Sequence, residues 1–236
     1  MGRTTHLRML PVLLAVTVAL IVGATGQEAC AQNGFEARIF FEFNSAGPGD
    51  LGVHVFLDGE AWKNLKIVNP QGKVIAEVEG KRSIKQTGLT ELFFEGEEPS
   101  LEDVPVDEFL ARFPAGPYQF VFRTLEGDKI EVTATLSHVV PAAPLVAAQL
   151  SGTSLVINWT AVPGTPPDFP DQPDPQVVAY QVIVDSFQVT LPATATSVTV
   201  PPEFVASLES GEHPFEVLAI EAGGNQTITE GSFTKP

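Results

Sequence analysis

The sequence predicts an all-β protein built from two tandem β-sandwiches, and three observations support this fold class. Short runs of alternating apolar and polar residues, separated by Gly, Pro, Asn or Asp, recur from residue 35 to the end. Hydrophobic residues make up 44% of the 236 residues and include 16 Phe, enough to form a core. With one Cys, no Gly-X-Y period and no heptads, a disulfide scaffold, a collagen and a coiled coil are excluded.

The first 31 residues are predicted to be a secretory signal peptide. Arg3 and Arg8 precede the apolar run 9–22, and Ala29 and Ala31 place small residues before a cut at residue 32. The apolar run is shorter than the roughly 20 residues that a spanning helix needs, so we expect no stable membrane span. The expected location is therefore the periplasm or the extracellular space.

The chain is strongly acidic, with 13 Lys+Arg against 29 Asp+Glu and a formal net charge of −16. A polyanion would be repelled by such a surface, so nucleic acid is excluded as a partner. The same charge favours a chain that stays in solution, but it does not specify a fold.

A stiff segment, Val139-Val140-Pro141-Ala142-Ala143-Pro144, separates two strand-rich halves. We therefore predict an N-terminal β-sandwich domain over 32–140 and a second domain over 141–236, each of ordinary domain size.

In the first half, alternation and turn residues predict strands and a single short helix. The helix begins at Ser100, whose hydroxyl can cap it, and ends before Pro114. A strand over 53–57 is expected to close at Asp58-Gly59. The remaining expected strands are 35–43, 65–68, 73–78, 89–94, 118–125 and 129–136.

The second half carries a more specific pattern. The expected strands are 154–159, 180–184, 197–200, 215–219 and a final strand after Asn225. Trp159 in the first of them and Tyr180 in the next fall on core-facing positions.

This order of core residues over Pro144 to the end resembles a fibronectin type III domain. The resemblance implies a seven-strand sandwich, with His213 at the slot where that family usually has its tyrosine corner, so the hydroxyl-to-backbone bond is lost there. The first half has its own corner-like run, ending in Tyr118 and Phe120, and resembles an immunoglobulin-like sandwich. As a whole, the chain is similar to bacterial secreted proteins that carry a C-terminal fibronectin type III module.

The segment 47–52 matches the spacing of a dinucleotide-binding glycine motif, Gly-x-Gly-x-x-Gly. That motif requires a helix to follow, whereas residues 53–57 continue as a strand. We interpret these glycines as a hairpin loop and expect no cofactor.

Three carboxylates, Asp168, Asp171 and Asp174, lie in a proline-rich stretch and could offer oxygen ligands to calcium. The glycine and the bidentate glutamate of a calcium loop are missing, so we interpret the stretch as a solvated, stiff insertion. Calcium binding stays open as the alternative.

The histidines after the leader, His54, His138 and His213, have no ligand spacing, so we expect no metal site. No Gly-x-Ser-x-Gly motif is present, and adjacent carboxylates such as Glu97-Glu98 are interpreted as solvated surface. We therefore expect no catalytic residues and no enzymatic activity.

Two features of the sequence are candidates for contacts at the protein surface. Trp62 follows Gly59-Glu60-Ala61 and is the aromatic residue expected to be exposed, which makes it a possible ligand contact. Lys81, Arg82 and Lys85 form the densest basic cluster and are interpreted as protection of a sheet edge.

These expectations together favour an exported, non-catalytic binding or spacer module of the bacterial envelope or extracellular space. Its partner is expected to be a protein or a cell-surface component. The alternative is a carbohydrate-binding accessory or glycan-active protein that uses the N-terminal domain and Trp62.

Overall fold

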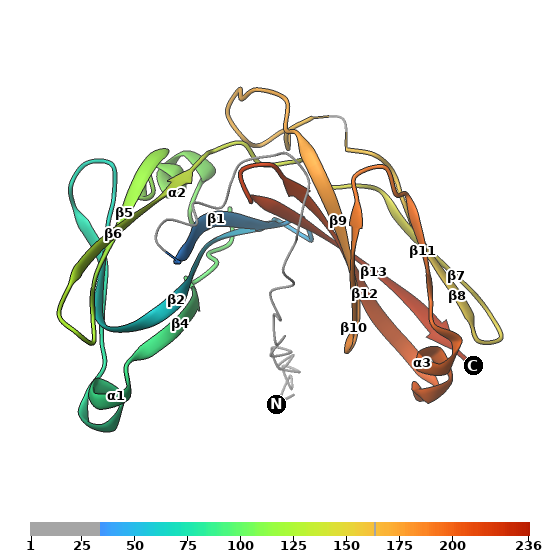
Figure 1. Ribbon diagram of the computed structural model, residues 1–236. Helices are drawn as coiled ribbons and strands as arrows, with labels where there is room; N and C mark the ends of the chain where they lie inside the picture. Colours follow the sequence, from blue (N-terminus) through green and yellow to red (C-terminus); the bar gives the residue numbers. More distant parts are fainter. Residues whose placement is uncertain (1–33, 163) are drawn as a thin grey trace, which may run out of the picture.

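A computed structural model describes residues 34–162 and 164–236, and it shows an all-β protein with two lobes (Figure 1). The predicted leader, its cut at residue 32 and Cys30 lie outside the described residues. Within the described ranges, no helix is both long and apolar enough to cross a bilayer. The fold class predicted from the sequence is confirmed.

The N-terminal lobe carries six strands and two short helices among the described residues. In chain order they are β1 (Glu36–Asn44), β2 (Asp50–Val68), β3 (Val74–Glu79), α1 (Arg82–Thr87), β4 (Leu89–Glu95), α2 (Val106–Arg112), β5 (Gly116–Thr124) and β6 (Lys129–Leu136). The second lobe contributes β7 (Val146–Ser151), β8 (Ser154–Trp159), β9 (Val177–Val184), β10 (Phe187–Pro192), β11 (Ser197–Val200), α3 (Pro202–Ser207), β12 (Gly211–Glu221) and β13 (Gln226–Lys235).

The long strand β2 organises the N-terminal lobe. Its first half pairs with β1 and β4, and its second half pairs with β3 and β5, with shifts of register between Asp58 and Asn64. The sheet therefore folds over on itself, and the strand does not end at Asp58-Gly59 as the turn signal suggested. Gly59 is needed at the bend because a Cβ there would lie 2.1 Å from Cδ1 of Phe35.

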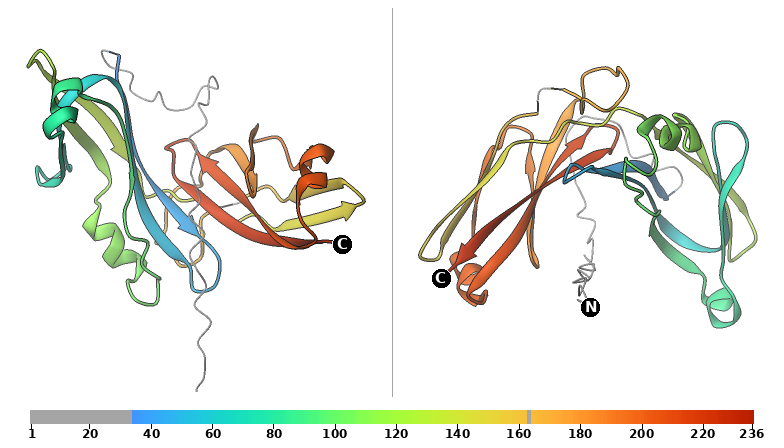
Figure 2. Two further views of the ribbon diagram at one scale, coloured as in Figure 1. Left: turned by 90° about the horizontal axis from the view of Figure 1, so that it is seen from below. Right: turned by 180° about the vertical axis from the view of Figure 1, so that it is seen from behind.

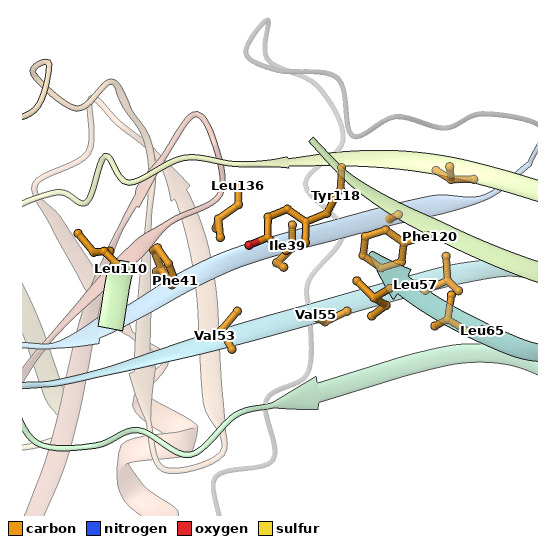
Figure 3. Close-up of a cluster of buried hydrophobic side chains, with 14 of the residues drawn as sticks. Ile39, Phe41, Val53, Val55, Leu57, Leu65, Leu110, Tyr118, Phe120 and Leu136 are labelled. Carbon is orange, nitrogen blue, oxygen red and sulfur yellow. The ribbon is translucent and has the colours of Figure 1, made fainter. Parts of the chain in front are cut away.

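The folded sheet encloses one apolar core (Figure 3). Alternate residues of β1 and β2, such as Ile39 and Val55, meet Tyr118 and Phe120 of β5 in this core. Because side chains alternate along a strand, the residues between them, including Glu42 and His54, lie on the opposite face.

The helix expected from Ser100 is shorter and begins later. Ser100 instead closes a turn, with its hydroxyl accepting from the backbone N–H of Glu102 at 3.2 Å and its carbonyl accepting from Val104 at 2.9 Å. Pro105 then precedes α2, which ends at Arg112. A second short helix, α1, was not expected, and it carries Arg82 and Lys85 of the basic cluster between β3 and β4.

The second lobe packs two sheets around a separate core. Strands β10, β9, β12 and β13 form one layer and β11, β8 and β7 form the other. Trp159 and Tyr180 are buried between them with ring centroids 5.5 Å apart, as the sequence predicted. The Tyr180 hydroxyl accepts a hydrogen bond from the Val162 backbone at 3.2 Å.

In each lobe, one side chain at a corner of the sandwich is hydrogen-bonded to a backbone carbonyl four residues earlier in the chain. In the N-terminal lobe, the Tyr118 hydroxyl donates to the Pro114 carbonyl at 3.1 Å, four residues back. In the second lobe, Nε2 of His213 lies 2.8 Å from the Glu209 carbonyl, also four residues back. The hydroxyl is absent, as expected, but the imidazole supplies the same link, so the corner keeps its local anchor.

The two lobes share one sheet, which was not expected from two tandem sandwiches. The order β10-β9-β12-β13-β1-β2-β5-β6 runs without a break through both lobes, and β1 pairs with β13 in parallel. The lobes meet at this pair and splay apart to either side of it (Figures 1 and 2).

Candidate functional site at the joint between the lobes

The joint is built on the parallel pairing of β1 with β13. Glu42, Phe43 and Asn44 lie opposite Gln226, Thr227 and Ile228. Just past β1, the backbone N–H and the hydroxyl of Ser45 both donate to the carbonyl of Ile228, at 3.1 and 2.8 Å. The backbone of one lobe is thus hydrogen-bonded directly to that of the other.

Asn225, the residue that precedes β13, connects three segments. Its Oδ1 accepts from the backbone N–H of Phe41 at 2.7 Å, and its Nδ2 lies 3.0 Å from the carbonyl of Ser137 and 2.8 Å from that of Val139. Asn225 is fully buried, and its amide meets partners on both its oxygen and its nitrogen. Thr227 adds a further bond from its hydroxyl to the carbonyl of Pro141.

Phe169 makes an apolar link across the same joint. It lies in the proline-rich stretch between β8 and β9, yet it is buried in the core of the N-terminal lobe, with its ring centroid 5.2 Å from that of Phe43. The backbone N–H of Ala142 also donates to the carbonyl of Gly164 at 2.7 Å. The stretch is therefore not only a solvated insertion, because one of its side chains completes the other lobe.

A charged cluster lies beside this joint and consists of the buried Glu42 and His54 and the partly exposed Glu98. Nε2 of His54 is 3.3 Å from Oε1 of Glu98 and 3.8 Å from Oε1 of Glu42. His54 is 1% exposed, and its Nδ1 has no hydrogen-bond partner among the described residues. Oε2 of Glu42 accepts a hydrogen bond from the side chain of Gln226, so the cluster touches the second lobe.

The local sequence explains why these side chains meet. Glu42 pairs with Gly52 across the β1–β2 hairpin, and His54 lies two residues further along the same face. Glu98 follows β4 on a segment held by the bond from the Gly96 backbone to Val53 at 2.8 Å. A Cβ at Gly52 would lie 2.3 Å from Oε1 of Glu98, so the glycine leaves the space that this carboxylate fills.

The electrostatics of the cluster follow from burial and crowding of negative charge. Burial, together with Glu98 and Glu95, raises the pKa of Glu42 to about 7, although His54 and Gln226 act in the opposite direction. Burial lowers the pKa of His54, but the hydrogen bond to Glu98 and the charges of Glu42, Glu95 and Glu98 outweigh it and leave that pKa raised. Burial, then Glu98 and Glu230, raise the pKa of Asp50 nearby to about 6.

Such a site can hold a proton shared between groups, or a cation. One imidazole and two carboxylates are ligands that divalent transition metals use. In the described parts of the chain, this is the one group of three His, Cys, Asp or Glu side chains whose ligand atoms lie within 4.8 Å of one another.

The residues singled out from the sequence lie elsewhere or in different surroundings. Trp62 is fully buried in the core of the N-terminal lobe, because the bend of β2 turns it inward, so the expectation of an exposed aromatic contact is wrong. The carboxylates of Asp168, Asp171 and Asp174 are exposed and are not gathered into a ligand group. Gly47 and Gly49 lie in the β1–β2 hairpin loop, as expected, whereas Gly52 lies in β2 opposite Glu42.

The sequence did not predict the cluster or the joint. Glu98 was interpreted as solvated surface, and no metal-ligand spacing links residues 42, 54 and 98. A weak signal is present, because Glu42 and His54 each interrupt a local apolar run, at 39–43 and 53–57. The sequence around Asn225 and Gln226 carries no comparable signal.

Comparisons with known proteins support no family for the chain. No protein-family model and no curated protein matches it. Solved structures that match include the spore cortex lytic enzyme SleM of Clostridium perfringens, with 22% identity, a TM-score of 0.33, and coverage of 40% of this chain and 28% of that one. A two-domain fibronectin type III segment of chicken tenascin has 13% identity, a TM-score of 0.29, and coverage of 86% and 100%.

A Ca2+-stabilised adhesin with which an Antarctic bacterium binds ice has 14% identity and a TM-score of 0.28, and the match covers 85% of this chain and 49% of that one. The chain therefore spans less than two thirds of the length of SleM and of this adhesin. At these scores and identities, what those proteins do does not transfer to this chain.

Proposed function

We propose that the chain is an exported, non-catalytic binding or spacer module of the bacterial envelope or extracellular space. In this proposal residues 1–31 are a leader, and domains 32–140 and 141–236 are held at a fixed angle for a protein or cell-surface partner. The observation that carries it is the sheet that continues from one lobe into the other through β1 and β13.

Domains joined by a linker usually move relative to each other unless their interface is large and apolar. Here the link consists of backbone hydrogen bonds, the buried Asn225 amide and the buried Phe169 ring. Moving the lobes would expose or leave unpaired several buried polar groups, each costing about 1–3 kcal/mol. A fixed angle is what a spacer needs, and it also presents two surfaces to one partner in a constant relation.

The carbohydrate alternative rested on an exposed Trp62 in the N-terminal domain. Since Trp62 is fully buried, no observation favours that alternative over protein or surface binding.

The proposal is tested by measuring the distance between the lobes. Spin labels at Glu126→Cys and Thr153→Cys, one exposed hairpin position in each lobe, report a single distance between the lobes in pulsed electron paramagnetic resonance. We expect a narrow distance distribution that broadens when Asn225 is replaced by Ala. A broad distribution in the otherwise unchanged chain would contradict a fixed joint.

A pull-down then tests the binding role. The chain and its Asn225→Ala variant are immobilised and exposed to envelope and secreted fractions and to a glycan panel. A partner retained by the chain and lost with the variant supports a binding module whose geometry matters, whereas glycans alone would support the alternative.

A further inference from the structure

We propose that Glu42, His54 and Glu98 bind one divalent transition-metal ion, for which Zn²⁺ is the probe, and that this ion fastens the joint between the lobes. The metal site stands on its own geometry, and only the fastening role rests on the proposed function.

The distances suit a shared ion. Zn²⁺ bonds of about 2.1 Å place two ligand atoms about 3.4 Å apart in a tetrahedral site. Nε2 of His54 lies 3.3 and 3.8 Å from the nearest oxygens of Glu98 and Glu42. The ligand atoms all lie within 4.8 Å of one another, and the Glu98 side chain is 27% exposed, so it has the freedom to move closer.

His54 is held so that one ring nitrogen faces both carboxylates. The imidazole is almost completely buried, and its Nε2, the nitrogen that would bind the ion, faces Glu98 and Glu42. Phe40 and Phe93 pack against the ring at centroid distances of 5.1 and 5.8 Å and hold it in this orientation.

The charge balance points the same way. Two carboxylates and a neutral imidazole carry two negative charges in a place where burial makes charge costly. Glu95 and Asp50 add to the negative charge around the cluster. One divalent ion neutralises the two ligand carboxylates without requiring any of the groups to take up a proton.

The donor set selects the class of metal. Calcium and magnesium prefer sites made of oxygen ligands, whereas an imidazole nitrogen with carboxylates suits zinc and other late first-row ions. Because His54 is central to the cluster, we assign the site to that class.

The position of Glu42 connects the site to the joint. Glu42 is the β1 residue paired with Gln226 of β13, and its second oxygen accepts a hydrogen bond from the Gln226 side chain. An ion bound to the first oxygen would fix this carboxylate and therefore hold the start of β13 against β1.

Binding is measured by isothermal titration of ZnCl2 into the untagged full chain after chelator treatment and dialysis. We expect one Zn²⁺ per chain. In Glu98→Gln and His54→Phe the affinity should fall by more than the roughly 10- to 100-fold that loss of an outer-shell partner causes. Glu97→Gln is the matched control, because Glu97 is exposed and adjacent to Glu98, and it should bind as the unchanged chain does.

Circular dichroism of each variant checks that it is folded, and Glu98→Gln is the milder change because that side chain is partly exposed. Absence of one-to-one binding, equal affinity in Glu98→Gln and Glu97→Gln, or binding of CaCl2 as tight as ZnCl2 would overturn the metal assignment.

The fastening role is measured separately with the labelled pair Glu126→Cys and Thr153→Cys. In the Asn225→Ala background, whose distance distribution is expected to be broad, we expect Zn²⁺ to narrow the distribution, and Glu98→Gln to abolish that narrowing. Site-specific binding without narrowing would overturn the fastening role but not the site. A broad distribution in the chain that keeps Asn225 would instead refute the fixed joint itself.

Discussion

Asn225 accepts a hydrogen bond from the backbone N–H of Phe41 at 2.7 Å, across 184 positions of the sequence. The same side chain donates to the carbonyls of Ser137 and Val139. A single buried amide therefore connects the first strand of one lobe, the last strand of the other and the segment between the lobes.

Replacing Asn225 by Ala should lower the free energy of unfolding by about 3 kcal/mol, because several buried backbone groups lose their partner. Urea denaturation followed by circular dichroism measures the change. Asn158→Ala, on the outer side of β8, should stay within about 0.5 kcal/mol of the unchanged chain. Equal stabilities for the two variants would show that the amide does not hold the joint.

Phe169→Ala should destabilise the N-terminal lobe although residue 169 belongs to the second half of the chain. Removal of a buried Phe side chain costs about 3–5 kcal/mol, and we expect the lower end because Phe169 enters from the rim of the core. The matched control is Leu145→Ala, since Leu145 is 76% exposed. Thermal unfolding of both variants checks the prediction, and an unchanged melting temperature for Phe169→Ala would argue against the link.

The two corners allow a paired test. Tyr118→Phe removes the hydroxyl that donates to Pro114 and should cost about 1 kcal/mol. His213→Phe removes the bond to Glu209 but keeps the stacking on Phe233, whose ring centroid is 5.4 Å away, and should cost less because this bond is exposed. Urea unfolding of both variants gives the two values, and a larger loss for His213→Phe would reverse this ranking.

Gly59→Ala should destabilise the protein by about 1–3 kcal/mol, because the added methyl group would collide with the Phe35 ring at the bend of β2. Gly164→Ala serves as the control, since a Cβ at position 164 would meet no atom within 4 Å. The comparison uses chemical denaturation of both variants. Equal stability of the two variants would mean that the Phe35 ring moves aside without lowering the free energy of unfolding.

Glu216 supplies a pH prediction. Burial, with Glu230 directly opposite on β13, raises the pKa of Glu216 above its ordinary value of 4.5. Because the folded state then binds the proton more tightly than the unfolded state, ionised Glu216 destabilises the fold at a pH above its folded pKa. This destabilisation disappears as the pH falls below about 4.5.

Glu216→Gln should therefore raise the free energy of unfolding relative to the unchanged chain at pH 7.5 and lose that advantage at pH 4. Urea denaturation at both pH values measures it, with the exposed Glu209→Gln as the control. A gain that is the same at both pH values would assign the effect to packing rather than to charge.

The strands could be predicted because their alternation is local. Residues 35–43 and 154–159 carry the pattern of β1 and β8 in their own side chains, and the β1–β2 hairpin loop is visible in Gly47 and Gly49. Trp62 was placed wrongly because the turn signal at Asp58-Gly59 is local too, whereas β2 continues through it to reach β5.

The joint and the cluster could not be predicted in the same way. Phe41 and Asn225 are far apart in sequence, and neither residue type indicates which distant segment it will meet. The contact of Glu42, His54 and Glu98 depends on the β1–β2 register and on the path of the chain after β4. Such relationships exist only once several strands have been assembled.

The parallel direction of β1 and β13 has a mechanical consequence. Tension applied between residue 36 at the start of β1 and residue 235 at the end of β13 would draw the two strands in opposite directions along their length. The hydrogen bonds around residues 42–44 and 226–228 would be loaded in shear, together, rather than opened one after another like a zipper. The junction of the lobes is thus oriented so that its hydrogen bonds share a pulling force between them.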